Sequence, residues 1–335
     1  MDTYRGLAIF LVVLFHAAGN FRDATGRESV PVLDPITMFF DPYRMPLLLI
    51  LSGLLLHRGL AKPLGAYFGG KFRKILWPLV VWSSVQLIIS ARYDDFFSPV
   101  EWINGTYQWF LVVLMVCFMV APLTRWIPAI ALAVAFIIIL IVVKDEVPES
   151  ARILFYGSFF FLGAALGPLV PRIQALPVWA PVLLGLIGIT IGVCSATELL
   201  IVNRAEPWTV LFPLPGLVAL LWLGPRLPSF PPLDQIGRNS IIYYTVHTGV
   251  LLVTSQIWGA AGWPDTKIRF TVLFIIAIAV PAFLTRYRQQ CNLLFEFPTR
   301  RQRTTATSAS GHTAATSAMD PARPKPSTLE PPRES

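Results

Sequence analysis

Ten apolar runs, separated by short polar segments, make up most of the chain. Each run is close to the length that a helix needs to cross about 30 Å of hydrocarbon. The pattern therefore predicts an all-α fold, a polytopic membrane helix bundle of about ten transmembrane helices. The runs lie at about residues 5–21, 43–57, 75–91, 107–123, 127–143, 152–168, 178–202, 208–224, 240–259 and 268–286.

The composition of the chain agrees with a membrane protein. Of its 335 residues, 55% are hydrophobic and 14% are charged, and the mean hydropathy is +0.62. Soluble domains contain about 25% charged residues. The three cysteines, Cys117, Cys194 and Cys291, have no CxxC spacing, which argues against a disulfide framework and a thiolate metal site. We expect neither a metal site nor a permanently bound cofactor.

The distribution of basic residues predicts the orientation in the membrane. A net charge of +8 could indicate nucleic-acid binding, but the basic residues lie in short loops beside apolar runs, where lysine and arginine set orientation. They are more frequent in the loops that would lie inside if the N-terminus is cytoplasmic. We therefore expect a multi-pass protein of the cell (inner or plasma) membrane, with both termini cytoplasmic and no nucleic-acid partner.

The last part of the chain has a different composition. From about residue 304 it consists mostly of Thr, Ser, Ala and Pro, with too few large apolar side chains to form a core. The sequence thus predicts two parts, a transmembrane domain at 1–290 and a disordered cytoplasmic tail at 291–335.

The first apolar run contains two ionisable residues, Arg5 and His16. They are 11 residues apart, so at about 100° per residue they point within about 20° of each other, some 16 Å apart along the helix. Ionisable groups at membrane depth normally face a bundle interior or a wet cavity. An imidazole can act as a general base toward a hydroxyl; the alternatives are a structural His16 and an Arg5 that reaches the cytoplasmic interface.

The second run and the loop after it carry further candidates. Ser52-Gly53 permits close approach, either of a thin ligand or of another helix, and helix packing is the more common reason. Lys71, Arg73 and Lys74 follow in the next cytoplasmic loop. These cations could bind a phosphorylated ligand, bind anionic lipid, or only fix the orientation.

Other polar and aromatic residues are expected to contact substrate or support the structure. His247 follows Tyr243 by four residues, so the two share a helix face and could form a polar network. Arg44 begins the second run, and Trp109 belongs to an aromatic cluster at the start of the fourth. The chain has no P-loop, HExxH or GxGxxG motif, so catalysis would need residues dispersed over several helices.

Together these patterns resemble the integral-membrane acyltransferase 3 family over about residues 1–290. Each pattern is short, and the resemblance depends on their order and spacing. They are Asp2-x-x-Arg5-Gly followed by His16, Met45-Pro46 leading to Ser52-Gly53, Lys71-x-x-Lys74-x-x-x-Pro78, Trp109-Phe110-Leu111, the Phe-Phe-Leu-Gly run at 160–163, and Gly237-Arg-Asn-Ser240 leading to Tyr243 and His247. Lys71 and Lys74 stand where arginines are usual.

The resemblance implies roughly ten helices and an O-acyltransferase. It would move an acyl group, commonly acetyl, from cytoplasmic acyl-CoA to a hydroxyl of a glycan, sugar or lipid-linked acceptor. It also implies that Arg5 and His16 are required for activity and that the basic loop contacts the phosphates of coenzyme A. In this hypothesis the pantetheine arm passes Ser52-Gly53 toward His16, which deprotonates the acceptor or carries the acyl group.

Two other classes of protein fit parts of the sequence. A secondary transporter could use Arg5, His16 and His247 as a polar site at mid-membrane. A scaffolding membrane protein could use the tail for interactions, and it would tolerate substitution of Arg5 and His16.

Overall fold

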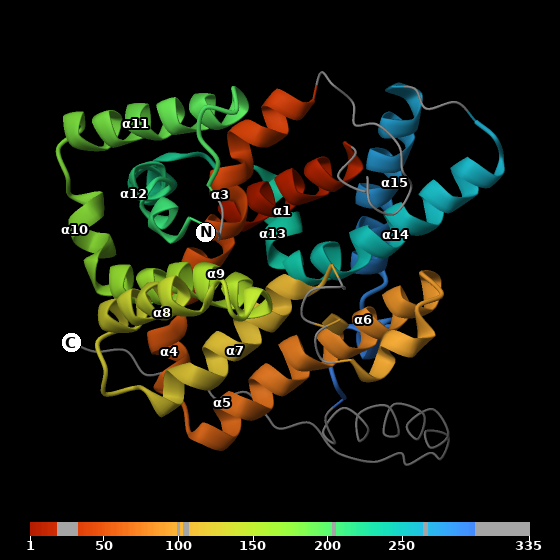
Figure 1. Cartoon of the computed structure of the whole chain (residues 1–335), viewed down its shortest axis with the longest axis horizontal. Helices are drawn as coiled ribbons and strands as arrows, with labels where there is room; N and C mark the ends of the chain where they lie inside the picture. Colours follow the sequence, from red (N-terminus) through yellow and green to blue (C-terminus); the bar gives the residue numbers. More distant parts are fainter. Residues whose placement is uncertain (19–32, 99–100, 103–106, 203–205, 264–266, 299–335) are drawn as a thin grey trace, which may run out of the picture. The chain divides into compact units, whose positions relative to one another are not determined.

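A computed structural model of the chain describes residues 1–18, 33–98, 101–102, 107–202, 206–263 and 267–298 (Figure 1). The chain divides into two units, Met1–Phe297 and Pro298–Ser335, and the fold described here is that of the first. Most of the predicted disordered tail lies outside the described residues. Within the described ranges, every regular element is helical, which confirms the all-α prediction.

The longer helices follow the predicted apolar runs in order. Short helices, a π-helical turn and 3₁₀ turns connect them. The α-helices are α1 (Asp2–Ala17), α3 (Asp34–Gly53), α4 (Leu56–Leu60), α5 (Leu64–Lys71), α6 (Trp77–Ile89), α7 (Trp109–Leu123), α8 (Ala129–Val143), α9 (Pro148–Leu166), α10 (Val170–Gln174), α11 (Trp179–Ala196), α12 (Leu214–Leu223), α13 (Pro231–Arg238), α14 (Ser240–Ala260) and α15 (Lys267–Arg286).

Within the described residues, six helical segments are long and apolar enough to cross a membrane, so the predicted count of about ten is not confirmed. Two further apolar helices, α7 and α8, have 15 residues each. The helices α1, with Arg5 and His16, and α14, with Tyr243 and His247, are not among the six. The six segments are Asp34–Leu60, Leu64–Ile89, Ser150–Gln174, Trp179–Ala196, Pro207–Arg226 and Lys267–Arg286.

The first helix packs backbone to backbone against α13. A Cβ atom on Gly6 would lie 1.9 Å from the Leu233 carbonyl oxygen, and one on Gly237 would lie 1.9 Å from that of Asp2. Only glycine permits so close an approach. The helix α1 also contacts α3, α14 and α15 (Figure 1), so its side chains are surrounded by other elements.

A second glycine contact joins α3 to α9. A Cβ atom on Gly53 would lie 2.0 Å from the Phe160 carbonyl oxygen, and one on Gly163 would lie 2.3 Å from that of Ile50. Gly53 therefore takes part in close helix packing, which was one of the two roles considered for Ser52-Gly53. A ligand contact at Gly53 stays a prediction.

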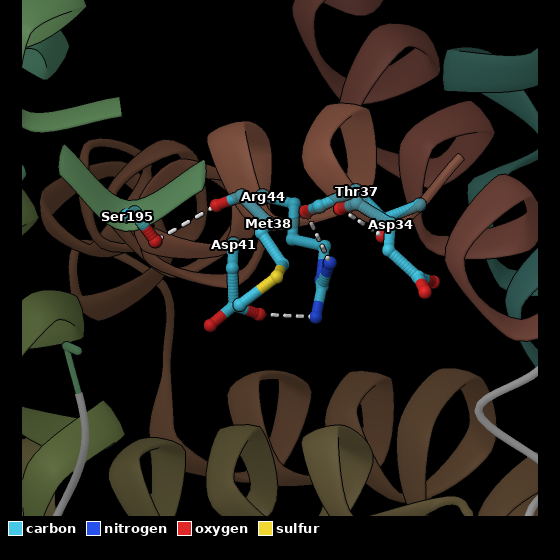
Figure 2. Close-up of polar contacts among 6 residues, drawn as sticks. All are labelled: Asp34, Thr37, Met38, Asp41, Arg44 and Ser195. Carbon is cyan, nitrogen blue, oxygen red and sulfur yellow. Dashed lines mark hydrogen bonds and ion pairs between the residues drawn. The ribbon is translucent and has the colours of Figure 1, made fainter. Parts of the chain in front are cut away.

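Two helix-interior prolines free carbonyl groups that side chains of other helices then bind. Pro42 lacks the N–H that would bond Met38 O within α3, and the hydroxyl of Ser195 in α11 donates to that oxygen at 2.8 Å (Figure 2). Pro122 has the same effect on Phe118 O in α7, which accepts a 2.9 Å bond from the Tyr67 hydroxyl. These bonds hold α11 against α3 and α5 against α7.

Candidate functional site

Arg5 extends from the first turns of α1 to the C-terminal end of α3. Its Nη2 donates to the Leu51 carbonyl oxygen at 3.4 Å. The last carbonyls of a helix lack partners within the helix and carry a partial negative charge, which a cation stabilises. Arg5 therefore binds a helix end in the protein interior, and its side chain is half-buried.

A small cavity of about 120 Å³ lies beside Arg5. Residues from α1, α3, α7, α14 and the π-helical turn Phe72–Leu76 surround it. Its polar lining groups are Arg5, Ser52, Ser240 and Tyr244. The cavity thus brings together two predicted site residues, Arg5 and Ser52. The lining also includes Ile75, the residue directly after Lys74 in the basic turn.

His16 lies near the other end of α1 and contacts aromatic rings from two other segments. Its ring centre is 5.4 Å from that of His247 in α14 and 5.9 Å from that of Tyr107, just before α7. The cavity at Arg5 is also lined by α14. The side chains of Arg5 and His16 therefore both face α14, as their spacing predicts.

His247 is held in one tautomer by the preceding turn of its own helix. Its Nδ1 lies 2.9 Å from the Tyr243 carbonyl oxygen, which can only accept, so Nδ1 carries the proton and Nε2 is an acceptor. The side chain is 1% exposed. Among the described residues, Nε2 has no hydrogen-bond partner.

A second buried acceptor belongs to Gln108, which directly precedes α7 and lies against the same stretch of α14. The Gln108 amide nitrogen donates to Thr245 O at 3.1 Å, and its Oε1 has no partner within the described part of the chain. A buried hydrogen-bond acceptor without a donor lowers the stability of the fold by about 1–3 kcal/mol. Native proteins therefore rarely keep one unless it has a role. The acceptors of Gln108 and His247 could both bind a hydroxyl donor.

Tyr244 connects the surroundings of His16 with the cavity at Arg5. Its hydroxyl donates to Tyr107 O at 3.0 Å and accepts from Phe110 N–H at 3.2 Å. Its ring centre is 5.9 Å from that of His247, and it also lines the cavity. The sequence analysis paired His247 with Tyr243, four residues away. The spacing of three to Tyr244 gives the same helix face and could have identified this residue.

Arg44 is buried in α3, where it contacts Asp41 and Thr37 (Figure 2). Only 6% of it is exposed, and it forms an ion pair with Asp41 and donates to Thr37 O at 3.3 Å. Its guanidinium carbon lies 3.4 Å from the centre of the Phe15 ring, next to His16. A buried arginine needs such a counter-ion, and the sequence analysis did not single out Asp41.

Trp109 and Tyr243 have different surroundings. The Trp109 ring centre is 4.7 Å from that of Tyr156. The Arg152 guanidinium carbon lies 5.4 Å from the Trp109 ring centre. Tyr243 contributes its backbone carbonyl to His247. Arg152 was not a candidate from the sequence, because nothing in its local pattern separates it from other loop cations.

The three predicted phosphate-binding cations share one turn but not one environment. The Lys71 Nζ lies 3.2 Å from the centre of the Phe118 ring, a cation–π contact. Arg73 forms a 2.5 Å ion pair with Glu296 and donates through Nε to Phe297 O at 3.1 Å. Lys74 is exposed.

The segment that holds Arg73 comes from the end of the described chain. Residues 291–297, which the sequence analysis placed in the tail, contact α6 and the π-helical turn. Trp77 and Trp82 donate to Leu293 O and Leu294 O at 2.6 and 3.1 Å. Phe295 stacks on Trp82 with ring centres 5.6 Å apart.

These features define an all-helical membrane protein with polar and ionisable groups enclosed between its helices. No group of three or more His, Cys, Asp or Glu side chains in the described ranges is placed to hold a metal ion. A family model described as an acyltransferase domain matches residues 1–286. The chain belongs to this family, acyltransferase 3, which indicates a membrane acyltransferase. Neither the curated proteins nor the solved structures contain a match, and no observation favours a transporter.

Proposed function

We propose that the protein transfers an acyl group, in the simplest case acetyl, from cytoplasmic acyl-CoA to a hydroxyl of a glycan, sugar or lipid-linked acceptor. The observation that carries this proposal is the position of His16. It is enclosed beside His247 on the face of α1 that also carries Arg5, in a member of an acyltransferase family.

The donor would bind where the basic turn meets the cavity. Lys71, Arg73 and Lys74 supply positive charge for the phosphates of coenzyme A. Ile75 forms part of the wall of the cavity that Arg5 and Ser52 line. A donor with its phosphates at the basic turn therefore has its pantetheine arm beside this cavity, pointing into the bundle.

The chemical step needs a base, and His16 is the candidate. Its imidazole takes the proton of the acceptor hydroxyl while the hydroxyl oxygen attacks the thioester carbonyl carbon. The carbon–sulfur bond then breaks, and the coenzyme A thiolate takes the proton from the imidazolium. Direct attack is the simpler route; transfer through an acyl-imidazole of His16 is the other. Arg5 lies about 16 Å along α1 from His16, so its guanidinium would hold an anionic group of the donor through a charge-assisted hydrogen bond.

The unfilled acceptors near His16 support a hydroxyl substrate. A second hydroxyl of the acceptor can donate a hydrogen bond to His247 Nε2 or to Gln108 Oε1, which removes the cost of leaving that buried atom without a donor. This would orient the acceptor oxygen beside the ring of His16. The reacting hydroxyl keeps its single proton for His16.

The reaction can be tested with the full chain in proteoliposomes. Radiolabelled acetyl-CoA is added together with a cell-envelope extract as the source of acceptor. We expect label to enter the acceptor fraction as an ester that hydroxylamine releases, with one free coenzyme A formed per acetyl group transferred. Label in the acceptor fraction at the level of protein-free liposomes would contradict the proposal.

A further inference from the structure

A larger cavity lies on the other side of α1 and plays no part in the proposed reaction. It has a volume of about 370 Å³ and lies among α1, α3, α11 and α12. Its lining is apolar except for Tyr43, Arg44 and the indole N–H of Trp222, which donates to Leu176 O at 3.1 Å. The Tyr43 hydroxyl donates to Gly188 O at 2.5 Å, and the charge of Arg44 is paired with that of Asp41.

This cavity is separate from the candidate active site. Leu7 and Leu11 form its wall on α1. At about 100° per residue, Leu7 points about 200° away from Arg5, and Leu11 about 140° away from His16. The backbone of α1 therefore lies between the cavity and the two catalytic candidates.

The cavity reaches the surface that faces lipid. Three of its four walls belong to membrane-spanning candidates, Asp34–Leu60, Trp179–Ala196 and Pro207–Arg226. On α11, Val182 and Ile189 both line the cavity and are 50% and 54% exposed. Its opening on α11 therefore lies between side chains that contact the hydrocarbon of the bilayer.

We propose that this cavity binds one hydrocarbon chain of a membrane phospholipid, which enters sideways from the bilayer. Water would find no hydrogen-bond partner there, and an empty space would lose the dispersion contacts of its walls. An apolar cavity of about 150 Å³ holds benzene, so this volume suits on the order of a dozen carbon atoms. The ion pair at Arg44 leaves no net charge to bind an anionic headgroup, so the chain itself is what is recognised.

Photo-crosslinking of the full chain tests the proposal. The protein is reconstituted in phosphatidylcholine vesicles that contain a phosphatidylcholine with a diazirine at the middle of one chain, irradiated, digested and mapped by mass spectrometry. Tyr43 lines the cavity and is 9% exposed, so we expect adducts there. Adducts on Leu186, on the exposed face of α11, report ordinary lipid contact.

A filled cavity should exclude the probe. A Cβ atom on Gly185 meets only Ala219 Cβ, at 3.7 Å, so the side chain of Gly185→Leu can grow into the cavity without striking backbone. We expect it to reduce the Tyr43 adducts at least fivefold and to leave those on Leu186 unchanged. Ile187→Phe, which adds volume on α11 away from the cavity, should change neither. Leu11→Phe fills the cavity from α1 if Gly185→Leu does not fold.

Three outcomes would overturn the proposal. The first is labelling of Leu186 without Tyr43. The second is labelling of Tyr43 that neither cavity-filling variant reduces. The third is labelling of Tyr43 by a diazirine-bearing long-chain acyl-CoA but not by the phospholipid probe, since the occupant would then be a donor chain. None of these results depends on acyl transfer. The test of lipid binding is therefore independent of the proposed function.

Discussion

Arg5 and His16 could be placed on one helix face from their spacing alone, because the period of an α-helix is fixed. Their partners could not be predicted in the same way. Leu51 O, Tyr107 and His247 reach them from distant parts of the chain, and only tertiary packing decides which segments meet. The sequence pairs His247 with Tyr243 but does not favour it over Tyr244, since residues three and four apart are equally close neighbours on a helix.

His247 is expected to position His16 or the acceptor and not to bind the donor. His247→Ala removes the buried hydrogen-bond acceptor Nε2 beside His16. The His16 imidazole becomes charged when it takes the proton, and a hydrogen bond to a charged group contributes about 1.5–3 kcal/mol. We therefore expect kcat to fall about tenfold to a hundredfold, with the KM for acyl-CoA unchanged. Steady-state kinetics of the purified protein measure both. An unchanged kcat, or a loss confined to KM, would contradict this role.

At the scale of elements, glycines and prolines determine how the helices meet. Gly6, Gly53, Gly163 and Gly237 let backbones touch, whereas Pro42 frees a carbonyl that another helix binds. The sequence raised helix packing for Gly53 but could not name α9 as the partner. The sequence also places residues 291–297 in the tail, because the last apolar run ends near residue 286. The tryptophans that contact this segment, Trp77 and Trp82, lie far earlier in the chain, so the local sequence does not reveal the contact.

The packing of α3 on α9 gives a stability prediction. Gly53→Ala places a methyl group 2.0 Å from the Phe160 carbonyl oxygen, so the backbones must separate, at a cost of about 1–3 kcal/mol. The matched control is Gly69→Ala in α5, where no atom lies within 4 Å and alanine should stabilise the helix by about 0.5–1 kcal/mol. Thermal unfolding in detergent measures both. A Gly53→Ala protein as stable as the unsubstituted chain would contradict the backbone contact.

The contact between Glu296 and Arg73 gives a prediction about donor binding. If the phosphates of coenzyme A bind the basic turn, they compete with the Glu296 carboxylate for Arg73. Glu296→Gln should therefore lower the Kd of coenzyme A by up to about fivefold, the change that corresponds to about 1 kcal/mol for a partly exposed ion pair. Isothermal titration calorimetry measures this.

The control for this experiment is Glu101→Gln. It removes a comparable pair with Arg92 in a segment predicted to face the other side of the membrane, and coenzyme A binding should not change. Weaker binding by Glu296→Gln would show that Glu296 supports the donor site and does not compete with the donor.

At the scale of the whole molecule, the helical class and the order of the apolar elements follow from the hydrophobic pattern. The number of membrane crossings does not follow from this pattern. The helices α1 and α14 carry the polar groups of the site, α7 and α8 are short, and these four are outside the six spanning candidates. The helix α1 is also short, with 16 residues, whereas α14 has 21 residues and is excluded by its hydropathy. Burial of polar groups inside a bundle lowers the hydropathy of a helix without moving it out of the membrane, so composition alone undercounts a helix such as α14.

The orientation can be tested with reporter fusions. An excess of basic residues in the inner loops predicts an even number of crossings with both termini in the cytoplasm. A green fluorescent protein fused to the C-terminus should fluoresce, and alkaline phosphatase fused there should be inactive. Active alkaline phosphatase at the C-terminus would mean an odd number of crossings if the N-terminus is cytoplasmic, and would contradict the topology.

The central claim is that His16 is the base of an acyl transfer, and one comparison tests it most directly. Acyl transfer in proteoliposomes is measured for the unsubstituted chain, for His16→Ala, and for His57→Ala, which removes an exposed histidine outside the site. We expect His57→Ala to keep full activity. We expect His16→Ala to fold and insert but to transfer acetyl about 10²–10⁴-fold more slowly. A His16→Ala protein that acylates its acceptor at the unsubstituted rate would show that His16 is not the base.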